Sequence, residues 1–266
     1  MLSALLLSAA VAGIGTPSPA PKPAKPIRAL LVLGGCCHDY AHQKDVLAKG
    51  LAERANIEVT IAYDPDMGTT HKNPVYENPD WAKGFDVVIH DECTSDVKEI
   101  DVVNTILAPH RAGLPAVFLH CGMHSYRTEG FPKSTPWFEF TGMPSTGHGP
   151  QVPIAVQFLD TSNPITKDMA DWTTVNEELY NNSAGKPLDT AHPLARGTQM
   201  VGGSPVECVC VWTNTYGKTR VFATTLGHNT ETVSDPRYLN MVTRGLLWTL
   251  NKLGKDGKPA SGYGPK

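Results

Sequence analysis

The chain has 266 residues, of which 23 are basic and 26 acidic, giving a formal net charge of −3 at pH 7. This balance excludes a protein that binds nucleic acid through general electrostatic attraction. Charged residues make up 18% and hydrophobic residues 41% of the chain, so the composition is that of a globular protein rather than a disordered one. The most apolar run, residues 2–14, is too short to span a bilayer.

Residues 1–20 have features of an export signal. They carry no charged side chain, residues 2–15 are apolar, and Ala10 and Ala12 supply a small-x-small cleavage site. Residues 21–27 are rich in proline and suit an extended linker. Because the usual positive start is missing, the alternative is a buried or disordered N-terminal tail. Export to a periplasm or to the outside of the cell, where thiols can oxidise, is the favoured interpretation.

The first half of the remaining chain alternates short apolar runs with helical patterns. The continuous apolar run at residues 28–35 is typical of a buried parallel strand, and residues 57–63, 85–90 and 115–120 predict three further strands. Residues 43–55 and 97–107 carry apolar side chains at helical spacing. This alternation predicts a doubly wound, mostly parallel α/β sheet with right-handed crossovers.

The second half of the chain lacks this alternation of strands and helices and predicts mainly β-strands, followed by one final helix. Residues 151–159 have strand character, and residues 206–226 predict a β-hairpin that turns at Gly217. Residues 235–253 predict a final helix with an apolar stripe and with Ser234 or Asp235 as its N-cap. A single domain is therefore expected over residues 28–253, followed by a flexible tail at residues 254–266. The sheet edge that a hairpin can leave exposed would allow a homodimer.

The six cysteines do not suggest a disulfide framework. They are sparse for this length, and the adjacent Cys36 and Cys37 would not easily bridge each other without strain. The repeated C-x-x-C spacing of zinc fingers is absent. Free, buried cysteines are therefore expected at Cys93, Cys208 and Cys210.

Polar side chains gather after four of the predicted strands. In open α/β sheets, ligands bind at the carboxyl ends of the strands. The segments at these ends are residues 34–40 (GGCCHDY), 90–93 (HDEC), 120–127 (HCGMHSYR) and 226–229 (LGHN). Four strand ends thus deliver histidines, cysteines and carboxylates to one edge of the sheet, and this is the strongest functional signal in the chain.

A metal site is the first chemistry that this edge predicts. His38, His124 and His228 come from three different loops, and neutral imidazoles are suitable ligands for zinc or another divalent ion. With one open position, such a centre can polarise a carbonyl or activate water. Glu178 or Asp39 would then move a proton. The alternative is that these histidines only hydrogen-bond to loop backbones.

A cysteine nucleophile is the second chemistry. Cys121 follows a buried strand, and a strand-to-helix elbow there would expose its thiol and lower the thiol pKa, with His228 as the base. The alternative is that Cys121 packs into the sheet as a small apolar side chain. Arg127, Tyr126 and Trp212 are candidates for binding a sugar, with a surface ion pair or core packing as the alternatives.

At these residues the chain resembles the ThuA-like, trehalose-utilisation family, over residues 28–253. The resemblance rests on residues 34–40, 120–127, 177–180 (EELY) and 211–228 (VWTNTYGKTRVFATTLGH), the last of which is long and specific. It implies a flavodoxin-like fold of the class I glutamine amidotransferase type. It also implies a link to the breakdown of trehalose and related disaccharides, often alongside oxidoreductases that make 3-keto sugars.

The resemblance would place an amidotransferase nucleophile near Cys121, with His124 three residues on, and a catalytic histidine near His228. Two departures argue against amidotransferase chemistry. The elbow reads His-Cys-Gly-Met-His rather than Gly-x-Cys-x-Gly, and Thr230 stands where a carboxylate is usual. The cleft is therefore expected to serve another reaction.

The function expected from the sequence is that of an exported enzyme acting on a keto-sugar or keto-glycoside. Isomerisation, elimination or hydrolysis with the help of a divalent metal would fit. The alternatives are a cysteine-dependent hydrolase and a carbohydrate-binding module without catalysis. The expected partner is a small carbohydrate, with no nucleic acid and no membrane span.

Overall fold

A computed structural model describes residues 24–180 and 186–266. The strands are β1 (Ile27–Gly35), β2 (Ile57–Asp64), β3 (Val87–Cys93), β4 (Ala116–Leu119), β5 (His148–Phe158), β6 (Trp172–Tyr180), β7 (Ala191–Val201), β8 (Ser204–Tyr216) and β9 (Thr219–Thr224). The helices are α1 (Tyr40–Ala52), α2 (Ile100–Arg111), α3 (Pro136–Thr141), α4 (Thr230–Ser234) and α5 (Pro236–Thr249), with short 3-10 turns η1 (Pro74–Glu77) and η2 (His120–His124). The predicted export signal and residues 21–23 of the predicted linker lie outside the described residues.

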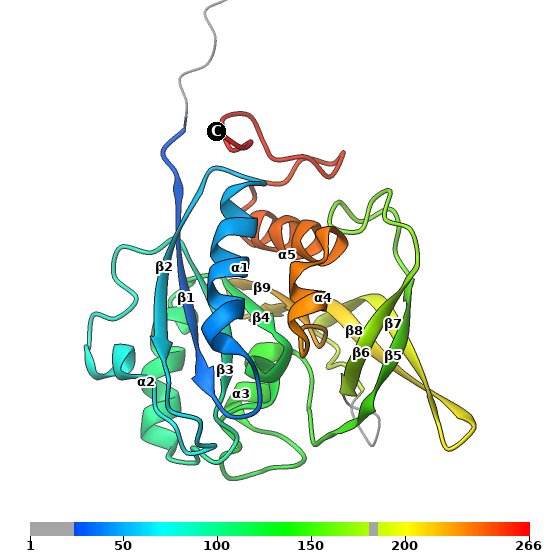
Figure 1. The fold of residues 1–266 in the computed structure, drawn as a ribbon. Helices are drawn as coiled ribbons and strands as arrows, with labels where there is room; N and C mark the ends of the chain where they lie inside the picture. Colours follow the sequence, from blue (N-terminus) through cyan, green and yellow to red (C-terminus); the bar gives the residue numbers. More distant parts are fainter. Residues whose placement is uncertain (1–23, 181–185) are drawn as a thin grey trace, which may run out of the picture.

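The described strands form one mixed sheet in the order β2-β1-β3-β4-β9-β8-β7-β5-β6 (Figure 1). Strands β2, β1, β3, β4 and β9 run parallel to one another, whereas β8, β7, β5 and β6 pair antiparallel. The expected α/β class is therefore confirmed, but the sheet is not mostly parallel. The long second-half strands are joined to neighbours without intervening helices, which favours antiparallel pairing.

Helices cover both faces of the parallel half. The packing around α1 and α5 includes Leu31, Leu47 and Leu246, and the packing around α2 and α3 on the other face includes Val32 and Ile106. Successive side chains of a strand point to opposite faces, and both faces of β1 are covered. This explains why the strand reads as one continuous apolar run.

The predicted hairpin and final helix are confirmed. Strands β8 and β9 pair antiparallel and turn at Gly217, whose φ of 59° suits a glycine. Helix α5 begins at Pro236, and the Asp235 carboxylate caps it by accepting the amide of Arg237. The tail that composition predicts as flexible returns to the body, where the carbonyl of Tyr263 accepts the amide of Asn56.

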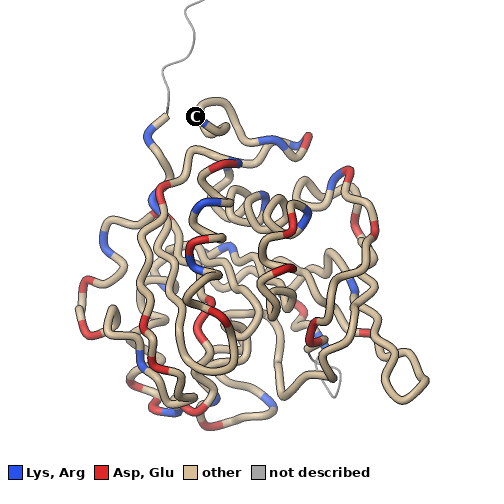
Figure 2. Tube along the Cα trace, viewed as in Figure 1, with Lys and Arg blue, Asp and Glu red and all other residues tan. Residues whose placement is uncertain are grey.

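No helix in the described part of the chain is long and apolar enough to cross a membrane. Figure 2 shows acidic and basic residues interspersed along the trace, in keeping with the near balance of charges in the sequence.

The cysteines differ from the expectation. Cys36 is bonded to Cys37, and Cys93 at the end of β3 is bonded to Cys121 in η2. The Cys93–Cys121 disulfide could not be predicted from the sequence, because these cysteines meet only when β3 and β4 pair side by side. The Cys36–Cys37 disulfide could not be predicted either, because it forms with Cys37 in a left-handed backbone conformation, with φ of 80°, that the sequence does not indicate. Among the described residues, Cys208 and Cys210 are free thiols as expected, although only Cys210 is buried and Cys208 is partly exposed.

Candidate functional site

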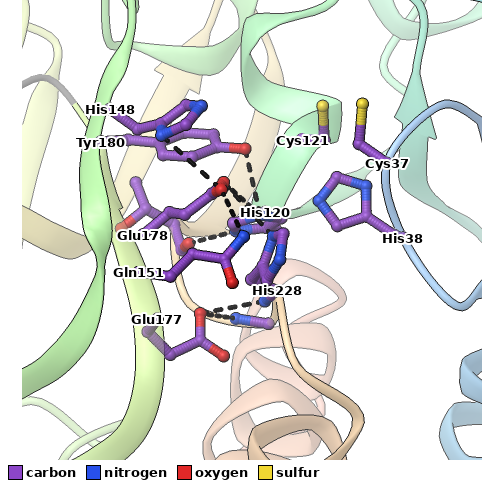
Figure 3. A network of polar contacts seen from close by, with 12 residues as sticks. Cys37, His38, His120, Cys121, His148, Gln151, Glu177, Glu178, Tyr180 and His228 are labelled. Atoms are coloured by element: carbon purple, nitrogen blue, oxygen red, sulfur yellow. Dashed lines mark hydrogen bonds and ion pairs between the residues drawn. The ribbon is translucent and has the colours of Figure 1, made fainter.

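Three histidines and one carboxylate meet at the carboxyl-terminal edge of the parallel strands (Figure 3). His38 follows β1, His120 follows β4, and His228 follows β9. Glu178 reaches the same point from β6, in the antiparallel half. Their ligand atoms all lie within 4.8 Å of one another. We call these four residues the His/Glu cluster.

Backbone carbonyls fix the orientation of two of the rings. Nδ1 of His38 donates to the carbonyl of Cys36 at 3.0 Å, and Nδ1 of His120 donates to the carbonyl of Thr225 at 2.6 Å. A carbonyl only accepts hydrogen bonds, so Nδ1 carries a proton in both rings, and Nε2 is the nitrogen left to act as a ligand. This is the arrangement that metal-binding histidines usually have.

Two ring nitrogens of the cluster are buried without a hydrogen-bond partner. They are Nε2 of His38 and Nδ1 of His228. Nδ1 of His228 lies 3.3 Å from Oε2 of Glu178, and Nε2 of His120 lies 3.6 Å from the same oxygen. Buried polar atoms in native proteins are nearly always partnered. These nitrogens converge on a carboxylate without well-formed hydrogen bonds, so they are suited to act as ligands of a bound cation.

The electrostatics of the cluster suit a cation as well. Burial, together with His120 and His228, lowers the pKa of His38 well below its ordinary value, so its ring is neutral at pH 7. Burial opposes ionisation of Glu178, but the neighbouring rings outweigh it and hold the pKa of Glu178 far below its usual range. Glu178 in turn raises the pKa of His228. Metal ligands must be deprotonated, so a bound ion would displace any proton from His228.

Gln151 and Tyr180 orient Glu178 and His120 further, and His148 and Gln151 form an exposed rim. Nε2 of Gln151 donates to Oε1 of Glu178 at 3.2 Å, and the exposed His148 lies 3.7 Å from the same oxygen. The Tyr180 hydroxyl donates to Nε2 of His120 at 3.0 Å. Hydrogen bonds to neighbouring groups thus hold the ligand atoms within the protein, whereas His148 and Gln151 are exposed to solvent.

Glu177 holds the loop that carries His228. Its carboxylate accepts three backbone N–H groups, those of Gly227, His228 and Asn229, at 2.9 to 3.2 Å. Glu177 is fully buried. Glu178, the carboxylate that the sequence predicts for this site, faces the cluster. The role of Glu177, which holds the loop of residues 227–229, was not predicted.

Two predicted residues lie outside the cluster. Nδ1 of His124 is hydrogen-bonded to the Ser145 hydroxyl, and its ring stacks on Tyr180 instead of facing His38. His120, at the start of the same segment, takes the place predicted for His124. The Asp39 carboxylate is half exposed and pairs with His42 at 2.8 Å, so it does not reach the cluster.

The other predicted residues are mostly buried. Cys121 is 1% exposed and bonded to Cys93, so it is not the exposed thiol that was expected. Trp212 is fully buried and donates to a backbone carbonyl, which corrects its predicted contact with a sugar. Tyr126 is buried and donates to Glu92, which corrects its predicted substrate contact as well. Arg127 is partly exposed and lines a cavity of about 490 Å³.

Asp91, at the end of β3, gives a pH-dependent prediction. Burial, helped by the neighbouring Glu92, raises the pKa of Asp91 well above its ordinary value. Folded chains then hold a proton that unfolded chains release, so this residue lowers stability as pH rises above its unfolded pKa of about 4. Asp91→Asn should raise the thermal midpoint at pH 7, and the gain should vanish near pH 4. An unchanged or lower midpoint at pH 7 would contradict this assignment.

Comparison with known proteins shows which family the chain belongs to. The ThuA family, described as trehalose utilisation, matches residues 28–249. A search of curated proteins finds no match.

Solved structures share the fold. A putative ThuA-like protein from Parabacteroides merdae is 18% identical with a TM-score of 0.65, covering 91% of this chain and 98% of its own. One from Bacteroides uniformis is 16% identical with a TM-score of 0.64, covering 89% and 97%. A β-galactosidase from Rahnella sp. R3 is 15% identical with a TM-score of 0.54, covering 86% of this chain but 32% of its own. With the family match spanning most of its length, this chain belongs to the ThuA family.

Proposed function

We propose that this chain is a metal-assisted enzyme acting on a carbohydrate that bears a carbonyl group, a keto-sugar or keto-glycoside. The observation that carries the proposal is the His/Glu cluster, in which two buried ring nitrogens lack hydrogen-bond partners. Three imidazoles and one carboxylate suit zinc or a similar divalent ion. The trehalose-utilisation description of the family supports a sugar as the substrate.

A divalent ion held by the cluster would polarise the sugar carbonyl or its enediol. The chain's own residues would bind and orient the substrate and move its protons. Glu178 completes the donor set in this arrangement and is no longer the proton carrier expected from the sequence.

His148 takes the role of the proton carrier. It is exposed at the rim, and its Nδ1 donates to the carbonyl of Gly149 at 2.9 Å, which leaves Nε2 able to accept a proton. Isomerisation, elimination and hydrolysis through an enolate all need such a group beside a polarised carbonyl.

Turnover of a 3-keto-disaccharide by zinc- or manganese-loaded protein tests the proposal, with the unoxidised disaccharide as the control substrate. Product is expected only from the keto-sugar and only with metal. His148→Asn should lower kcat by about 100-fold while leaving the metal content unchanged, because general acid–base catalysis contributes on that order.

Two results would contradict the proposal. Saturable sugar binding without product after long incubation would indicate a carbohydrate-binding module. Turnover that is unchanged after chelation would remove the metal from the mechanism. A cysteine-dependent hydrolase is not proposed, since Cys121 is buried and bonded to Cys93.

A further inference from the structure

Four cysteines form a second cluster of reactive groups at the same edge of the sheet. Cys36 and Cys37 follow β1, Cys93 ends β3, and Cys121 lies in η2. They are joined as Cys36–Cys37 and Cys93–Cys121. The function proposed above uses none of these sulfurs.

The two disulfides contact each other through one sulfur of each. Sγ of Cys36 lies 3.5 Å from Sγ of Cys93. Disulfides exchange when a thiolate attacks a sulfur of another disulfide. A thiolate released at Cys36 would therefore already be in contact with a disulfide that it can attack.

Exposure decreases in steps along this set of sulfurs. Cys37 is exposed and Cys36 is half-buried, whereas Cys93 is 5% and Cys121 is 1% exposed. A reductant in solution can thus reach Cys37, while the Cys93–Cys121 bond is shielded. We propose that the Cys36–Cys37 disulfide is a reaction site for small or protein dithiols and starts a disulfide relay that ends at a free thiol on Cys121.

The relay has three balanced steps. A thiolate of the dithiol attacks Sγ of Cys37, which forms a mixed disulfide and expels the Cys36 thiolate. This thiolate attacks Sγ of Cys93, which forms a Cys36–Cys93 disulfide and expels the Cys121 thiolate. The second thiol of the dithiol then resolves the mixed disulfide and leaves Cys37 as a thiol. One dithiol is oxidised, and the chain gains two electrons and two protons.

The relay delivers its product next to the His/Glu cluster. The Cys121 sulfur and a ring nitrogen of His38 are within 4.8 Å of each other, and Figure 3 draws Cys37, Cys121 and His38 in one view. Thiolates are strong ligands for zinc. Reduction would therefore add a potential ligand beside His38, and oxidation would withdraw it.

The relay is tested by mapping disulfides after limited reduction. The oxidised full-length chain is mixed with one equivalent of dithiothreitol, quenched with acid at intervals, alkylated and digested for mass spectrometry. We expect a peptide linked through Cys36 and Cys93, together with alkylated Cys37 and Cys121. Alkylation of both Cys36 and Cys37 while Cys93 and Cys121 remain linked at every time point would overturn the relay.

Two variants separate the relay from direct reduction. Cys36→Ser, combined with Cys37→Ser so that no thiol is left beside Cys93, removes the attacking sulfur. Release of the Cys121 thiol by the same dithiol should then slow by about tenfold or more, because the exchange rate depends on access of a thiolate to the disulfide. Cys208→Ser removes a cysteine outside the cluster and should keep the wild-type rate. Equal rates in all three proteins would show that the dithiol reaches Cys93 directly. The wild-type mapping needs no variant and stands even if the double variant folds poorly.

Discussion

His120→Ala is expected to abolish tight binding of a divalent metal, whereas His124→Ala should leave it intact. His120 supplies one of four converging donors, and its Nδ1 is locked to a backbone carbonyl so that Nε2 faces the cluster. Loss of residues that merely orient metal ligands costs about 10- to 100-fold in affinity, so removal of a ligand itself should cost more than about 100-fold.

The two variants are well matched. Both histidines belong to η2, both are buried, and both rings contact Tyr180. Any general loosening of this turn should therefore affect them alike, while only His120 faces the donors. Zinc content per chain after dialysis, followed by calorimetric titration with zinc, measures the difference. Equal metal retention by both variants, or a wild-type chain that binds no divalent ion, would show that the cluster is only a hydrogen-bonded group.

The parallel half of the fold could be predicted because its inner strands are buried on both faces. Residues 28–35 and 115–120 read as continuous apolar runs, and their polar ends had to lie at one edge. The antiparallel half was harder, because its strand order depends on pairings between distant segments. That order decides which side chains reach the site: Glu178 arrives from β6, the edge strand of the antiparallel half.

The place of the site in the fold could be predicted from the sequence more readily than the residues that form it. The segment HCGMH was placed at the correct strand end, but the pattern does not show which of its two histidines faces the cluster. His120 has a left-handed φ of 40° at the start of η2, and this local turn sends its ring toward Glu178 while His124 stacks on Tyr180. Such a turn leaves no periodic signal.

Glu177→Gln is expected to lower the free energy of unfolding by about 3 kcal/mol and to weaken metal binding. The Glu177 carboxylate is fully buried and accepts three amides of residues 227–229. An amide side chain has one acceptor oxygen, and its NH₂ group would face N–H donors. Hydrogen bonds to charged groups contribute about 1.5–3 kcal/mol, and each buried polar group left unpaired costs about 1–3 kcal/mol.

The exposed Glu231 in α4 provides the matched control for this change, because Glu231→Gln removes the same charge from the same region without uncovering buried amides. Its effect on stability should stay within about 0.5 kcal/mol. Urea unfolding measures both variants. Because Glu177 holds the loop of His228, Glu177→Gln should also reduce zinc affinity by about 10- to 100-fold under conditions where the chain remains folded. If Glu177→Gln is destabilised but keeps full zinc affinity, Glu177 has a purely structural role. The position of His228 would then not depend on the hydrogen bonds between Glu177 and its loop.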